Sequence, residues 1–245
     1  MAGAFPRDPL LYPFEVPQHS FVWRAGGTET LSCSAPVSEM TARRHAILAI
    51  GSNASPAQLT RKFAQERFVD PSSPEGCIPV LRAEVDDVDV AYGAHVADYG
   101  ALPATLLDTP GVCAQIFVTW LTSMQLERMN ETEGLGHSYQ LRRMLGVRSN
   151  GDVVDALGYV TVAGVAVLGG SPLGLVSTDA QGSSWRRGTQ RQAWDLLSLD
   201  MGCGTDGKAL LDRVLGSPAW RGRVESHLDS HRLAETHAPV LAGSY

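Results

Sequence analysis

The chain has 245 residues, of which 44% are hydrophobic and 19% are charged, which is enough apolar material for the core of one ordinary globular domain. A net charge of −6 has the wrong sign for nonspecific binding of nucleic acid, and no apolar run is long enough to span a bilayer. Four scattered cysteines without a Cys-x-x-Cys pair predict neither a zinc site nor a disulfide framework. We therefore expect a reduced, cytoplasmic, soluble protein that acts on small molecules, with no nucleic-acid, membrane or metal partner.

Residues 1–42 are predicted to form an extended N-terminal arm. Four prolines in its first half fix φ and remove backbone donors, and a stretch rich in Gly, Ser and Thr follows them. Its apolar residues indicate that the arm lies on the protein's own core or on a neighbouring subunit, so a homodimer through the arm is one expectation. The rest of the chain is divided into a main domain at 43–215 and a C-terminal helical extension at 216–245.

The first strand is expected at His45–Ile50, a short apolar run that Gly51 ends. A helix is expected directly after it. Ser55 would be its N-cap, Pro56 its first residue and Gln58 the second member of a capping box.

The middle of the chain is predicted to be β. Valines alternate with aspartates around position 88, which places Asp87 and Asp89 on the wet face of a strand. Two more strands are expected at 103–107 and 112–121, with a turn containing Pro and Gly between them.

A second helix is expected to begin at Thr122, where Gln125 completes a capping box. It would end at Gly134, because a left-handed residue commonly stops a helix.

The remaining chain is predicted to hold two further strands and a helical tail. The strands are expected at 139–145 and 153–168, and helices are expected to begin at Thr189 and at Ser217. Because the strands outnumber the helices in the core and do not alternate with them, the fold class is α+β rather than a doubly wound sheet.

The junction Ile50-Gly51-Ser52-Asn53-Ala54, between the first strand and its helix, is a candidate binding site. A glycine straight after a buried strand lets a ligand approach the backbone, and a helix N-terminus offers unpaired N–H donors. The loop therefore predicts a site for an anion. It is not a phosphate loop, because the second glycine and the Lys-Ser/Thr pair are missing. It also lacks the Gly-x-Ser-x-Gly pattern that would make its serine a nucleophile. The alternative is a plain tight turn.

Glu133 is the candidate catalytic residue. It shares a helix stripe with Leu126 and Met129 and therefore faces inward. Glu131 lies about 200° around the helix and faces water with Glu127. Burial and the negative end of the helix dipole both disfavour an ionised Glu133, which suits a carboxyl that exchanges a proton near neutral pH. The alternative is a tethering carboxylate that forms a salt bridge with a core arginine.

The loop at residues 50–54 followed along the chain by Glu133 resembles the pattern of the γ-glutamyl cyclotransferase family. In that family a Tyr-Gly-Ser-Asn loop follows the first strand and a Leu-Asp-x-x-Glu-Gly-like segment ends a short helix. The corresponding segments here are Ile50–Ala54 and Leu126–Gly134, with Tyr139 just beyond. The wider likeness spans about residues 45–215 and includes Asp89-Val-Ala-Tyr-Gly93, Ala104-Thr-Leu-Leu-Asp-Thr-Pro-Gly111 and Trp194-Asp-Leu-Leu.

The resemblance implies a small mixed β-barrel with flanking helices that needs no cofactor. It also implies a reaction in which the α-amine of a γ-glutamyl peptide or amine attacks its own γ-carbonyl, giving 5-oxoproline and a free amine. Glu133 matches the family's catalytic glutamate, and the loop amides would hold the substrate's α-carboxylate and polarise its γ-carbonyl. The substrate-binding residues so implied are Ile50, Gly51, Ser52, Asn53, Ala54, Tyr139 and Trp194.

The sequence departs from the family's pattern in ways that bear on the substrate. Ile50 replaces the loop tyrosine, Asn130 replaces an Asp-like residue before Glu133, and Trp194 aligns with a tyrosine that lines the pocket. These changes predict a broader and more apolar pocket than one for glutathione. Two alternatives follow: an amide hydrolase or biosynthetic tailoring enzyme of the same fold that acts on a non-glutamyl substrate, and a binding protein without activity.

Overall fold

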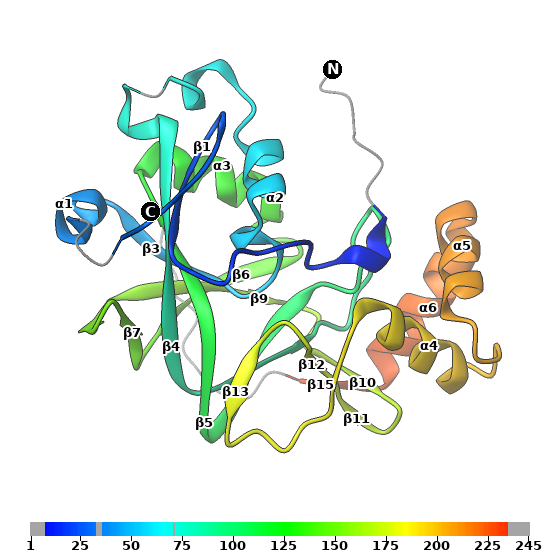
Figure 1. Ribbon diagram of the computed structural model, residues 1–245. Helices are drawn as coiled ribbons and strands as arrows, with labels where there is room; N and C mark the ends of the chain where they lie inside the picture. Colours follow the sequence, from blue (N-terminus) through cyan, green and yellow to red (C-terminus); the bar gives the residue numbers. More distant parts are fainter. Residues whose placement is uncertain (1–7, 33–35, 71, 235–245) are drawn as a thin grey trace.

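The computed structural model describes residues 8–32, 36–70 and 72–234, and two long strands organise them. β4 (Cys77–Tyr92) and β5 (Ala104–Leu121) pair antiparallel along most of their length and run through the molecule (Figure 1). β5 continues through the stretch where the sequence predicted a turn between two strands, so that prediction is wrong. Residues 109–112 of β5 bulge opposite the single residue Asp87 of β4, and in this bulge the missing N–H of Pro110 breaks no ladder hydrogen bond.

The predicted faces of β4 are right at Asp87 and wrong at Asp89. The register shifts between Asp86 and Val88, and Asp87, with a left-handed φ of 60°, is exposed. Val88 and Val90 lie in the hydrophobic core. Asp89 is also buried, with 1% of its surface exposed, because Arg187 and Ser183 cover it and bond to its carboxylate.

β4 and β5 belong to a mixed sheet that has twelve strands among the described residues. Its main path runs β14-β12-β4-β5-β3-β9-β6, in which β3–β9 and β12–β14 are parallel and the other neighbours antiparallel. The path is open, since no pairing of the described strands joins β6 to β14, so the closed barrel implied by the resemblance is not found. The other bounds on this path are β14 Arg187–Gly188, β12 Gly174–Leu175, β3 His45–Ala49, β9 Ala156–Thr161 and β6 Tyr139–Met144.

Shorter strands pair at the sides of this path or form a second sheet. At the sides lie β1 (Phe21–Arg24), β2 (Gly27–Thr30), β7 (Val147–Ser149), β8 (Asp152–Val153) and β13 (Asp179–Gln181). The second sheet contains β10 (Val165–Leu168), β11 (Ser171–Pro172) and β15 (Arg232–Leu233). The single strand expected over 153–168 is thus broken into parts. One break is a turn at 162–164, where Gly164 has a φ of 77°.

The described helices form two groups. α2 and α3 lie together at one end of the sheet, and α4, α5 and α6 lie together at another (Figure 1), where α4 packs on α5 and α5 on α6. Their bounds are α1 Val37–Thr41, α2 Pro56–Lys62, α3 Ser123–Glu133, α4 Gln190–Asp200, α5 Gly207–Gly216 and α6 Pro218–Ser230. Short 3-10 helices occur at η1 Pro9–Leu11, η2 Ser52–Ala54, η3 Glu66–Phe68 and η4 Pro74–Gly76. None of the described helices is long and apolar enough to cross a membrane.

Most predicted helix signals are confirmed. Thr122 and Thr189 each head a complete capping box, and Gly134 ends α3 in the left-handed conformation. Ser55 is the N-cap of α2, but its side chain makes no capping hydrogen bond, so the box predicted there is wrong. The Gln58 side chain instead bonds to Ser52 and to Arg61.

The N-terminal arm is more structured than predicted. β1 pairs with β4 of the same chain and with β2, and α1 follows within the arm. The prolines precede β1 rather than interrupt it, and β4 supplies a long-range partner that local sequence does not reveal. The homodimer through the arm stays a prediction.

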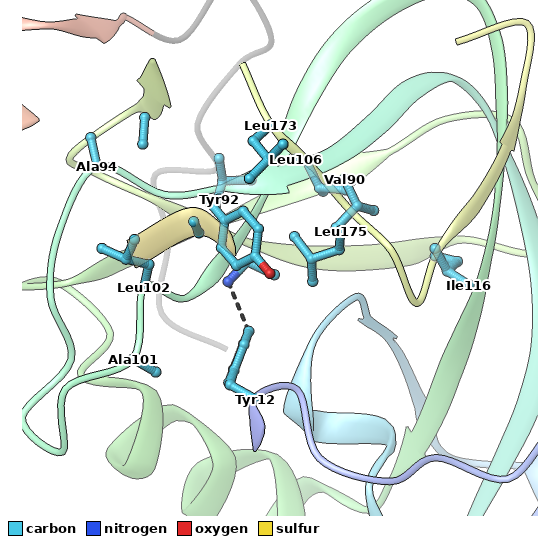
Figure 2. Close-up of a cluster of buried hydrophobic side chains, with 14 of the residues drawn as sticks. Tyr12, Val90, Tyr92, Ala94, Ala101, Leu102, Leu106, Ile116, Leu173 and Leu175 are labelled. Carbon is cyan, nitrogen blue, oxygen red and sulfur yellow. Dashed lines mark hydrogen bonds between the residues drawn. The ribbon is translucent and has the colours of Figure 1, made fainter. Parts of the chain in front are cut away.

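The core contains two clusters of buried apolar side chains. The larger one lies between the sheet and helices α4–α6 and reaches the arm at Tyr12, while the other lies under α2 and α3. Figure 2 shows part of the larger cluster around Tyr92 and Leu102.

Candidate active site

A cleft of about 790 Å³ opens where the two core clusters meet. It is lined by the arm, β3 and the loop after it, helices α2 and α3, the segment 95–99, the start of β5, and residues of β6 and β9. The charged residues that line the cleft are Arg61, Lys62, Asp98, Arg128, Glu131 and Glu133. The pocket expected from the sequence, broader and more apolar than one for glutathione, stays a prediction.

The loop after β3 presents its backbone to this cleft. β3 lies between β5 and β9 and is buried along most of its length, which fixes the position of the residues that follow. Gly51, Ser52 and Asn53 line the cleft. Their backbone N–H groups donate to no acceptor within the part of the chain that the structure describes. Three donors are therefore available to an anionic ligand.

Glu133, the last residue of α3, forms an ion pair with Lys62, the last residue of α2. The side chain of Lys62 is 1% exposed and that of Glu133 is 14% exposed. The inward stripe predicted for α3 is confirmed, because Leu126 and Met129 are buried. The tethering partner considered from the sequence was an arginine, whereas the structure supplies a lysine.

The Lys62 ammonium is held by three groups around it. Its Nζ donates to Asn53 Oδ1 at 2.7 Å and to Glu133 Oε1, and it lies 3.2 Å from Met129 Sδ. Arg128 Nε caps the end of α2 by donating to the Lys62 carbonyl at 3.0 Å. Lys62 thus ties the loop to the end of α3. Glu133 Oε2, in contrast, makes no hydrogen bond to any described residue.

Three buried phenols form a wall of the cleft. Burial raises the pKa of Tyr12, Tyr139 and Tyr159, and the negative charge of Glu133 adds to each increase. These hydroxyls therefore stay protonated at neutral pH and act as donors rather than bases. The Tyr159 hydroxyl donates to Asn130 Oδ1, and the rings of Tyr139 and Tyr159 meet edge to face at 6.4 Å.

His95 lies against this wall as a neutral ring. Burial lowers the pKa of His95 to about 4. Its Nδ1 lies 3.0 Å from Thr161 Oγ1, and its ring packs edge to face on Tyr139 at 5.6 Å. Near neutral pH His95 adds no charge to the cleft. No group of His, Cys, Asp and Glu that could hold a metal ion occurs among the described residues.

The cleft brings together six of the eight residues predicted for the site. Glu133, the three loop residues Gly51–Asn53, Ile50 and Tyr139 all line it. Ala54 is buried beneath the loop and Trp194 is fully buried in the larger core cluster, and neither lines the cleft. The position of Trp194 on α4 therefore does not support the substrate contact that the resemblance implies.

Several lining residues were missed from the sequence. Lys62 follows the buried Leu59 by three residues, so the helical period that located Glu133 could also have placed Lys62 inward. Tyr12, His95 and Tyr99 come from irregular segments and carry no such signal. The loop itself has no tyrosine, because Ile50 stands where the family's loop tyrosine would be. The arm nevertheless brings the Tyr12 hydroxyl against the same loop.

Comparisons with known proteins find similarity in structure alone. No protein-family model and no curated protein matches the sequence. A solved γ-glutamyl cyclotransferase is 14% identical with a TM-score of 0.39, covering 81% of this chain and 94% of that chain. An uncharacterized protein from Homo sapiens is 15% identical with a TM-score of 0.37 and the same two coverages. YkqA from Bacillus subtilis is 13% identical with a TM-score of 0.40, covering 88% of this chain and 72% of that chain.

Proposed function

We propose that the protein is an enzyme of the γ-glutamyl cyclotransferase type. The substrate is a γ-glutamyl peptide or γ-glutamyl amine. Its α-nitrogen attacks its own γ-carbonyl carbon, the bond between that carbon and the attached nitrogen breaks, and the products are 5-oxoproline and a free amine. The observation that carries this proposal is a half-satisfied carboxylate, Glu133, beside three unused backbone donors in one cleft.

The proton balance of the reaction explains why one carboxylate is central. The substrate's α-ammonium group loses two protons as it becomes the lactam N–H, and the departing nitrogen gains two as it leaves as an ammonium ion. A carboxylate that reaches both nitrogens can take a proton from the first and give it to the second. Lys62 holds Oε1 of Glu133 and thereby orients the carboxyl group. Oε2 is unbonded among the described residues and is therefore available for this proton transfer.

Ring closure is mainly a problem of orientation, because both reacting groups belong to one molecule. The free N–H groups of Gly51, Ser52 and Asn53 would bind the α-carboxylate. Asn53 also bonds to Lys62, so the anchor for the carboxylate and the proton-transfer group belong to one network. The aromatic faces of Tyr139 and Tyr159 would border the glutamyl chain.

The experiment is to incubate the purified full chain with a panel of γ-glutamyl peptides and γ-glutamyl amines and to follow 5-oxoproline by mass spectrometry. We expect 5-oxoproline from at least one member of the panel. Glu133→Gln should lower kcat by about 10²–10⁴-fold, the range for general acid–base groups.

Glu127→Gln is the matched control, because it makes the same change on the same helix at an exposed position outside the cleft. Its activity should equal that of the parent chain. Equal activity of the Glu133→Gln variant would overturn the role of this carboxylate. Release of glutamate instead of 5-oxoproline would replace the cyclotransferase by an amide hydrolase.

A further inference from the structure

Part of the N-terminal arm reaches the cleft and is anchored there. The short helix η1 is capped by Asp8, whose side chain accepts from the Leu10 backbone at 3.0 Å, and it contacts α4. Tyr12 follows it, and Phe14 packs between Tyr12 and Tyr99, with ring centres 6.2 and 6.4 Å away. In Figure 1 this dark-blue segment crosses from β1 toward helices α4 and α5. The arm is thus fixed on both sides of Tyr12.

The Tyr12 hydroxyl lies against the loop that carries the free N–H groups. Its oxygen accepts a hydrogen bond of 2.7 Å from the Ala104 backbone, and Figure 2 shows the side chain reaching from the arm to make this bond. A Cβ atom at Gly51 would lie 2.2 Å from the same oxygen. Only glycine allows the phenol to approach the loop this closely.

The hydroxyl proton of Tyr12 is unused. The oxygen serves as an acceptor for Ala104, and the hydroxyl donates to no acceptor in the described residues. Burial, Tyr99 and the charge of Glu133 raise the pKa of Tyr12, so the proton is retained. The Tyr12 phenol therefore lines the cleft beside Gly51 with a hydroxyl proton that is still available to a ligand, and the charge of Glu133 acts on it.

We propose that the Tyr12 hydroxyl donates a hydrogen bond to the γ-carbonyl oxygen of the substrate, so that the arm completes the active site. This inference rests on the proposed function. When the α-nitrogen attacks, negative charge develops on that oxygen, and a preorganised donor stabilises it. Once the α-nitrogen has attacked, both nitrogens and the γ-carbonyl oxygen are bonded to one carbon atom. Because Glu133 must reach both nitrogens, a donor near Glu133 has the γ-carbonyl oxygen within its reach.

The first test is Tyr12→Phe in the full chain, with 5-oxoproline formation as the readout. We expect kcat to fall about 100-fold, as for loss of one oxyanion donor. Tyr92→Phe is the matched control, because it also removes a buried hydroxyl with one backbone partner, Gly188, but lies outside the cleft. It should keep the parent kcat. An unchanged kcat in Tyr12→Phe overturns the inference while the proposed function stands.

A second test separates contact with the substrate from support of the fold. The γ-amide oxygen of the substrate is replaced by sulfur, a weaker acceptor, and the oxygen-to-sulfur rate ratio is compared between the parent chain and Tyr12→Phe. We expect the ratio to shrink by about 10-fold or more in the variant. A merely structural role lowers both rates equally and leaves the ratio unchanged, which overturns the inference. If the parent chain forms no 5-oxoproline at all, the proposed function fails and this inference fails with it.

Discussion

Two ion pairs of this protein, each with one buried member, differ in how many hydrogen bonds their carboxylates accept. Asp89, in β4, accepts at Oδ1 from Arg187 and from the Val90 backbone, both at 2.7 Å, and at Oδ2 from the Ser183 hydroxyl. Glu133 is held at one oxygen by Lys62, while its other oxygen has no bond among the described residues. A buried carboxylate that is bonded at both oxygens has little capacity left for a ligand, whereas a carboxylate with one unbonded oxygen in a cleft can bind a ligand or exchange a proton.

The two pairs also differ in which elements they join. Arg187 also donates to the Leu175 carbonyl at 3.1 Å, so the Arg187–Asp89 pair fastens β12 and β14 to the long strand β4. Lys62 and Glu133 join the ends of two helices at a cleft. In each pair one side chain is buried and the other is partly exposed. What distinguishes them is the unused hydrogen-bonding capacity of the carboxylate.

The largest expected effect on stability comes from Arg187→Met. The change leaves Asp89, which is 1% exposed, as a buried charge without a cation, and we expect the free energy of unfolding to fall by about 4 kcal/mol. Urea unfolding followed by circular dichroism measures it. A loss below about 1 kcal/mol would show that the Arg187–Asp89 pair behaves like an exposed one.

Lys62→Met should cost somewhat less, about 3 kcal/mol, because Glu133 keeps 14% exposure to the cleft. The double variant Lys62→Met/Glu133→Gln carries no uncompensated charge, so it should recover much of this loss in the same unfolding assay. If the double variant is as unstable as Lys62→Met alone, packing of the lysine stem rather than charge determines the cost.

Lowering the pH should weaken the fold through His95. Burial lowers the pKa of His95 from 6.5 to about 4. Between these values the unfolded chain binds a proton that the folded chain does not, so stability is complete above about pH 6.5 and falls as the pH drops. We expect His95 to make the protein about 2 kcal/mol less stable at pH 5 than at pH 8. His95→Gln should remove this slope and exposed His137→Gln should not. Equal slopes in both variants would contradict the assignment.

The smallest effect is expected for an exposed pair. Lys208 and Asp212 are 2.6 Å apart on α5, with side chains 46% and 57% exposed. Lys208→Ala should change the free energy of unfolding by only about 0.3 kcal/mol. If Lys208→Ala lowers the free energy of unfolding as much as Lys62→Met does, burial does not determine how much an ion pair contributes to stability in this protein.

The sequence predicted the parts of the site that depend on local rules. The strand before Gly51, the capping box of α3 and the inward turn of Glu133 follow from periodicity and capping within one element. The α+β class is likewise confirmed. These features need no knowledge of distant residues.

The parts that failed depend on long-range contacts. Asp89 is buried rather than exposed because Ser183 and Arg187, from a distant part of the chain, cover it and bond to its carboxylate. Tyr12 reaches the cleft because η1 packs on α4, some 180 residues later in the chain. The closed barrel was expected from the resemblance rather than from the residues, and the pairing of the described strands leaves the sheet open.

The most direct test compares Glu133→Gln with Asp89→Asn in parallel, measuring kcat for 5-oxoproline formation and the free energy of unfolding of both. Each change removes one charge and keeps the shape of the side chain. We expect both variants to lose stability, because each leaves a cation without its carboxylate. The folded molecules of Glu133→Gln should lose about 10²–10⁴-fold in kcat, while those of Asp89→Asn should keep the parent kcat. Full activity in folded Glu133→Gln, or equal losses of kcat in both variants, would contradict the assignment of Glu133 as the proton-transfer group.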